Sequence, residues 1–145
     1  LIDAVANMLA RSCEEVMEDI GTYLVSHPSM EGLRRLLRFG GVNFVEFLHS
    51  LDDLPGRARL AVPELDLPPI ELHEVGPGQF KLICSTEIAY FGHVMMGLLR
   101  AMADDYGALA LLSHDGTAAQ DEMISIILIE TAFSEGRDFH LGARA

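Results

Sequence analysis

Cysteine and positive charge are both scarce in this chain. It has two cysteines in 145 residues, Cys13 and Cys84, and they form no CxxC or zinc-ligand spacing. Reduced thiols in a cytoplasmic protein are therefore expected, rather than a disulfide framework. Ten Lys and Arg residues stand against 22 Asp and Glu residues, for a formal net charge of −12. This charge disfavours nucleic acid as a partner, because the phosphates would be repelled.

Long hydrophobic runs are also missing, although 50% of the residues are hydrophobic. The richest run, MISIILI at 123–129, has the length of a strand, whereas a membrane span needs about 20 apolar residues. We therefore expect no membrane span. There is no initiator Met, and Asp3 interrupts the opening apolar stretch, so no signal segment is indicated. Since the chain begins inside a helical pattern, we expect that some N-terminal residues are missing.

Catalytic and metal-binding motifs are absent as well. The sequence contains no P-loop, GxGxxG, HExxH or GxSxG pattern. The pairs Asp52-Asp53 and Asp104-Asp105 are adjacent, so on a helix their side chains diverge by about 100° and make no acid/base pair. No two of the six histidines have the i, i+4 spacing of a metal pair on one helix face. These absences predict that the protein is not an enzyme and holds no metal cluster.

Helical periodicity and capping signals fill the first part of the chain. Ser12 with Glu15, and Asn43 with Glu46, have the spacing of a capping box, which predicts that a helix starts at each. A short basic helix is expected between them, and Gly40-Gly41 would end it.

Pro55 stands between two of the expected helices. Proline is well tolerated in the first turn of a helix, where its missing N–H is no loss. We therefore expect a new helix that begins near Pro55 and ends at Pro63, with Asp52 or Asp53 as its cap.

The hydrophobic period changes after residue 67. Residues 70–72 and 80–84 alternate between apolar and polar side chains on either side of a GPG turn, which predicts a hairpin. Residues 90–106 return to the helical period, and Gly107 is a natural stop. Two more strands are expected at 108–112 and 123–129, joined by a polar loop at 113–122.

This order of elements predicts an α+β fold. N-terminal helices would pack on a four-stranded antiparallel sheet, with one long helix inserted between the two hairpins. We expect one domain over residues 1–145, with a helical part at 1–67 and the sheet plus the long helix at 68–145.

Four stretches together make a family pattern: EEVMEDIGTYLV, FVEFLHSLDDL, GRARLAVPELDLPPIEL and FGHVMMGLLRAMADDYG. From about residue 13 to 112 the chain resembles the heme-nitric oxide/oxygen binding (H-NOX) family, the sensor domain of soluble guanylate cyclases and their bacterial relatives. The resemblance implies the helix-and-sheet fold described above. It also implies a non-enzymatic signalling role, in which the domain reports NO or O2 through protein contacts to a histidine kinase or a cyclic-dinucleotide enzyme.

The resemblance implies a heme cofactor whose iron is bound by a histidine after the LDxL stretch. In this chain Pro55 occupies that place, in an alignment without gaps from Phe47 through Pro63. Proline has no side-chain donor atom, so it cannot ligate iron.

The family also has a Tyr-x-Ser-x-Arg motif that clamps the heme propionates. Neither of two alignments supplies its tyrosine or its arginine, and a glutamate in the place of the arginine has the wrong charge for binding carboxylates. The first alignment places the motif on Cys84, Thr86 and Ile88, and the second, shifted by one residue, on Ile83, Ser85 and Glu87.

Three alternatives follow from these substitutions. Heme could bind through a substitute ligand, for which His49, His93 and Cys84 are the candidates. The pocket could instead hold another apolar, lipid-like molecule such as a fatty acyl chain. In the third alternative the domain only docks with a partner, and Arg34, Arg35 and Arg38 would offer a basic face to an acidic partner.

Overall fold

The computed structural model describes residues 2–9, 12–61, 63–64, 67–86, 88, 90–118 and 121–130. Their helices and strands are α1 (Ile2–Leu9), α2 (Cys13–Ser26), a 3-10 turn (Pro28–Met30), α3 (Glu31–Arg38), α4 (Phe44–His49), a second 3-10 turn (Ser50–Asp53), α5 (Leu54–Ala61), β1 (Ile70–Gly76), β2 (Gln79–Ser85), α6 (Phe91–Tyr106), β3 (Leu109–Ala118) and β4 (Asp121–Glu130). None of these helices is long and apolar enough to cross a membrane.

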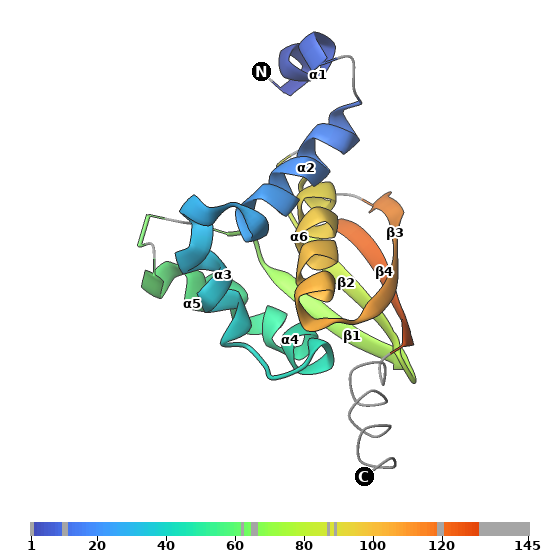
Figure 1. Ribbon diagram of the computed structural model, residues 1–145. Coiled ribbons are helices and arrows are strands. Elements are labelled where there is room, and N and C mark those ends of the chain that lie inside the picture. Colours follow the sequence, from blue (N-terminus) through green and yellow to red (C-terminus); the bar gives the residue numbers. More distant parts are fainter. Residues whose placement is uncertain are drawn as a thin grey trace, which may run out of the picture.

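The four strands form one antiparallel sheet with the order β1-β2-β4-β3. Alternate residues of the strands face the helices, among them Leu82, Ile124 and Ile126, which are fully buried. Helix α6 lies across this face, and α3, α4 and α5 are grouped beside it (Figure 1). The structure therefore confirms the predicted α+β fold, with the long helix placed between the two hairpins.

The two predicted capping residues start their helices as expected. Ser12 Oγ accepts a hydrogen bond from the N–H of Glu15 at 3.2 Å, and Asn43 Oδ1 accepts one from the N–H of Glu46 at 2.8 Å. The Glu46 carboxylate in turn accepts the N–H of Val42 at 3.1 Å. Both helix starts therefore follow from side chains next to them in the sequence.

Pro55 is the second residue of α5, in the first turn, as its chemistry predicts. The expected cap is wrong for Asp52, because its carboxylate accepts the N–H of Leu72 in β1 at 2.7 Å. Both Asp52 and Asp53 lie in the 3-10 turn that runs directly into α5, so the chain remains helical from α4 through α5. The Asp52 carboxylate therefore makes a long-range contact with the sheet, in place of the helix cap that its neighbours in the sequence predict.

The predicted polar loop at 113–122 is also wrong. The structure continues β3 to Ala118 and starts β4 at Asp121, with Ser113 opposite Ser125. The register shifts after His114, where Gly116 has a φ of +110°, which a glycine accommodates without strain. Polar residues of this stretch are accommodated in the strands because His114 bonds Glu122 and Asp115 bonds Ser125 across the hairpin.

Helices α2 and α6 approach each other closely. A Cβ atom added to Gly21 would overlap the carbonyl of Val94, and one added to Gly97 would overlap the carbonyl of Glu18. The hydroxyl of Thr22 donates to the carbonyl of Gly97 at 3.4 Å. The small residues therefore let the two backbones come into contact and fix α2 on the outer side of α6.

Candidate functional site

Pro55, the position to which the family resemblance assigns the iron ligand, lies on α5. Leu54 and Ala58 of this helix are buried in the core, while Pro55 between them is partly exposed. The pyrrolidine ring of Pro55 offers no lone pair to a metal. Among the described residues, no three His, Cys, Asp or Glu side chains are grouped so as to hold a metal ion.

The residues at the propionate-motif positions of the first alignment carry no positive charge. Cys84 is fully buried in β2, and burial, followed by the negative charge of Glu122, raises the pKa of its thiol to about 12. Cys84 is therefore a neutral thiol, whereas a cysteine that binds iron does so as a thiolate. Thr86 Oγ1 accepts the N–H of Ile88 at 2.9 Å, and the Ile88 side chain is exposed. In the second alignment, Glu87 lies outside the described residues.

His49, a candidate substitute ligand, ends α4 at the β1–β2 turn. Its ring meets the ring of Phe80 edge-on, with centroids 5.7 Å apart. Its Nε2 lies 3.8 Å from a carboxylate oxygen of Glu74, and about half of both side chains is exposed. His49 therefore contacts Phe80 and Glu74, which belong to the β1–β2 hairpin.

His93, the other histidine candidate, lies at the start of α6. Its ring stacks on that of His114, with centroids 4.4 Å apart and planes 9° apart. The pKa of His93 is below its ordinary value, first because burial disfavours the charged ring and second because His114 lies beside it. His114 bonds Glu122, which is opposite Cys84, whereas Phe80 beside His49 is four residues along the β2–β4 ladder. The two candidate histidines thus lie at opposite ends of the sheet.

A buried polar cluster surrounds His114, and the sequence analysis did not predict it. Glu122 is only 5% exposed and is the one buried charged side chain among the residues that the structure describes. Its carboxylate accepts the N–H of Gly92 at 3.0 Å and contacts His114 Nε2 at 2.9 Å. The N–H of Gly116 donates to His114 Nδ1 at 3.2 Å, so this network assigns the ring proton to Nε2. The alternation of Glu122 with Ile124, which places both on the inner face, is the sequence signal for it.

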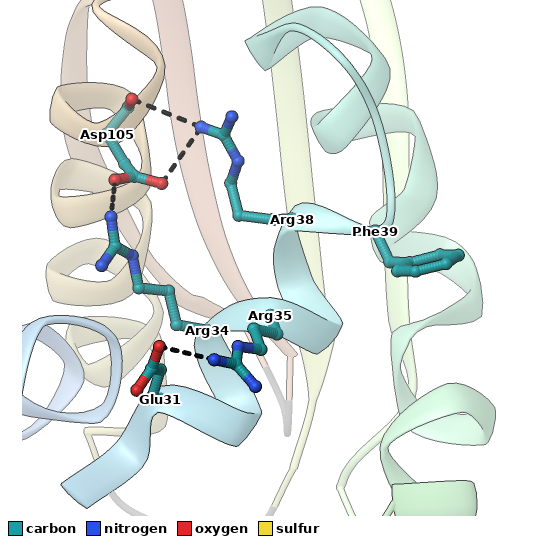
Figure 2. A pocket seen from close by; sticks show the side chains of 6 residues that line it. All are labelled: Glu31, Arg34, Arg35, Arg38, Phe39 and Asp105. Atoms are coloured by element: carbon teal, nitrogen blue, oxygen red, sulfur yellow. Dashed lines mark hydrogen bonds and ion pairs between the residues drawn. The ribbon is translucent and has the colours of Figure 1, made fainter. Parts of the chain in front are cut away.

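The three arginines proposed as a partner face lie on α3 and point toward other groups of this chain. Figure 2 shows Arg34 and Arg38 converging on Asp105 of α6, and Arg35 turned toward Glu31. Arg38 Nη1 lies 3.1 Å from Asp105 Oδ2, and Arg35 Nη2 lies 2.9 Å from Glu31 Oε1. Because Asp105 neutralises one charge and Glu31 another, three positive charges leave a small local excess in a strongly acidic chain.

Next to this cluster, the turn after α3 exposes apolar side chains. Phe39 is 88% exposed and Val42 is 82% exposed. Figure 2 shows the ring of Phe39 pointing away from the arginines and Asp105.

A four-stranded antiparallel sheet with one long helix across its inner face defines the class as an α+β domain. A family model described as Haem-NO-binding matches residues 1–111, which is more than half of the chain. The chain therefore belongs to the haem-NO-binding family, and the predicted family is confirmed.

Relatives of known sequence and structure agree with this assignment. The beta-2 subunit of soluble guanylate cyclase from Rattus norvegicus is 28% identical over 93 residues, which make up 64% of this chain and 14% of that subunit. The chain thus spans a small part of this relative.

Solved H-NOX structures share the fold. A mutant of an S. oneidensis H-NOX protein in the Fe(II) ligation state superposes with a TM-score of 0.75 at 21% identity, over 88% of this chain and 69% of that one. A mutant of the T. tengcongensis H-NOX gives a TM-score of 0.70 at 13% identity, over 91% of this chain and 72% of that one.

The described residues do not fit the way in which the family resemblance would hold heme. The α5 position has no donor atom, the buried thiol of Cys84 is neutral, and Thr86 and Ile88 provide no cation for a propionate. The ring of His49 contacts that of Phe80 in β2, and the ring of His93 stacks on that of His114 in β3.

Proposed function

We propose that this chain is a non-enzymatic signalling domain of the H-NOX family that acts through protein contacts, without heme iron ligated at position 55. Its membership of the haem-NO-binding family supports the signalling role. The partner would be a histidine kinase or a cyclic-dinucleotide enzyme, as the family resemblance implies. The observation that supports this proposal is Pro55, which stands where the family resemblance implies a histidine bound to the heme iron.

The proposed contact face combines the arginines of α3 with the exposed aromatic ring beside them. Arg34 and Arg38 are held in place by Asp105, whose negative charge offsets part of their positive charge and fixes their geometry. The side chain of Arg35 is 77% exposed, and Phe39 stands next to it in open solvent. An acidic partner with an apolar recess would satisfy both groups, since arginine and aromatic side chains are the usual anchors of protein interfaces.

The test is reconstitution of the purified chain with hemin, followed by reduction and addition of NO. The proposal predicts that no sharp Soret band forms and that the spectrum does not shift with NO. A sharp band that shifts on NO addition would overturn it and return the chain to the gas sensors. Mass spectrometry of a denatured extract belongs in the same experiment, because a stoichiometric fatty acid would instead identify a lipid carrier.

A further inference from the structure

A groove of about 480 Å³ lies between the start of α4 and the β1–β2 turn. Its apolar lining includes Phe44 and Phe80, which are almost fully buried, and Leu128 at the end of β4. Val42, with most of its side chain in solvent, and Tyr106 also line it. This volume is in the range of sites that take a small molecule or a large side chain.

Backbone contacts hold both walls of the groove in place. The hydroxyl of Tyr106 donates to the carbonyl of Gly41 at 2.7 Å, which fixes the segment that carries Val42. On the other side, the N–H of Leu128 donates to the carbonyl of Gly78 at 2.8 Å, which ties the β1–β2 turn to β4. A bound group would therefore meet a surface that is already formed, and little ordering of the protein would oppose binding.

The charges that line the groove have one sign. Of the described residues that line it, Glu46 and Glu74 are the acidic ones and none is Lys or Arg. Glu74 lies opposite Phe80 in the β1–β2 register. One oxygen of Glu46 accepts the N–H of Val42, so the carboxylate is oriented while it keeps further acceptor capacity. Among the described residues, His49 has its Nε2 3.8 Å from Glu74 and could compete for that carboxylate.

We propose that this groove binds a lysine or arginine side chain of a partner protein, flanked by apolar residues. The aliphatic stem would lie on Phe44 and Phe80, and the charged head would reach Glu46 and Glu74. Charge complementarity supports this occupant, since two carboxylates border an apolar floor that would not hold an anion. The groove shares no lining residue with the arginine cluster of α3 and does not include Pro55, so its binding is independent of heme.

The experiment measures the fluorescence anisotropy of a labelled peptide of alternating leucine and arginine against the full chain. Changing both carboxylates to amides, Glu46→Gln with Glu74→Gln, should weaken binding about tenfold. Glutamine at 46 still accepts the Val42 N–H, so the fold of the turn is kept. The control for the change at Glu74 is Glu71→Gln, which removes one negative charge from the same strand, three residues before Glu74, and lies outside the groove lining.

Two further binding measurements distinguish binding at this groove from general attraction of a cationic peptide to an acidic protein. A peptide of glycine and arginine with the same charge should bind more weakly than the leucine peptide, and Val42→Ser should weaken the leucine peptide alone. Equal losses in the groove variant and in Glu71→Gln would overturn the proposal, as would equal binding of the two peptides. Absence of binding by either peptide would also overturn it.

Discussion

Glu122 accepts a hydrogen bond from Nε2 of His114 at 2.9 Å, inside a core that is otherwise built from apolar side chains. The second carboxylate oxygen accepts the N–H of Gly92 in the first turn of α6. A Cβ on Gly92 would come within 2.7 Å of Glu122 Oε1, so the carboxylate fits only against a glycine. One buried acid therefore joins β3, β4 and the start of the long helix.

Removal of this carboxylate should cost more stability than removal of a neighbouring one. Glu122→Ala leaves the His114 N–H and the Gly92 N–H without their partner in the core, and we expect a loss of about 2–4 kcal/mol in the free energy of unfolding. Urea unfolding followed by circular dichroism measures it. Asp121→Ala is the control, because that carboxylate accepts the hydroxyl of Ser85 at 2.7 Å in an exposed hydrogen bond, and its removal should cost about 1 kcal/mol or less. Equal losses in the two variants would contradict the role given to Glu122.

The histidine stack should make stability depend on pH. The pKa of His93 in the folded chain is below its ordinary 6.5 because of burial and of His114, against the opposing charges of Glu14 and Glu122. As the pH falls below 6.5, the unfolded chain binds the proton first, so the contribution of His93 to stability is full above that pH and is lost toward the lower folded-state pKa.

Unfolding midpoints measured in urea at about pH 7.5 and pH 5.5 test this sign. His93→Phe keeps a ring on His114 and cannot titrate, so its midpoint should fall less between the two pH values than that of the wild type. A variant that loses as much stability on acidification as the wild type would show that His93 is not the group responsible.

The contact between α2 and α6 should have no room for even one added methyl group. In Gly97→Ala the new Cβ would overlap the carbonyl of Glu18, and we expect a loss of about 3 kcal/mol from the displaced helix. Gly32→Ala is the matched control, since a Cβ at Gly32 meets nothing within 4 Å and Gly32 lies inside α3. That change should gain about 0.5–1 kcal/mol from helix propensity alone. Denaturant midpoints that move in the same direction in both variants would be inconsistent with the packing described.

The sequence predicted the parts of the fold that depend on neighbours along the chain. The Asn43 cap, the Gly78 turn and the helix that ends before Gly107 each use residues within four positions, and the structure confirms them. Alternation likewise predicted the first hairpin and the core-facing side chains of β2.

The errors come from contacts between residues that are not neighbours along the chain. Asp52 was expected to cap a helix, but it bonds Leu72 in the sheet. His114 and Glu122 fall in the predicted polar loop because they are polar. Each provides the hydrogen-bond partner that allows the other to be buried in the core. The pairing of Arg38 with Asp105 spans 67 residues and has no local signal at all. The iron-ligand position and the division of the chain into one domain remain predictions.

The most direct test of the account is the heme spectrum of Pro55→His beside the wild type and Gly56→His. Gly56 is one residue further along α5 and has open space around it, so its variant adds the same imidazole in the wrong direction. After hemin reconstitution, reduction and NO addition, we predict a sharp, NO-shifted Soret band in Pro55→His alone. Identical spectra from all three proteins, whether they show a band or not, would contradict the assignment of Pro55 to the iron-ligand position.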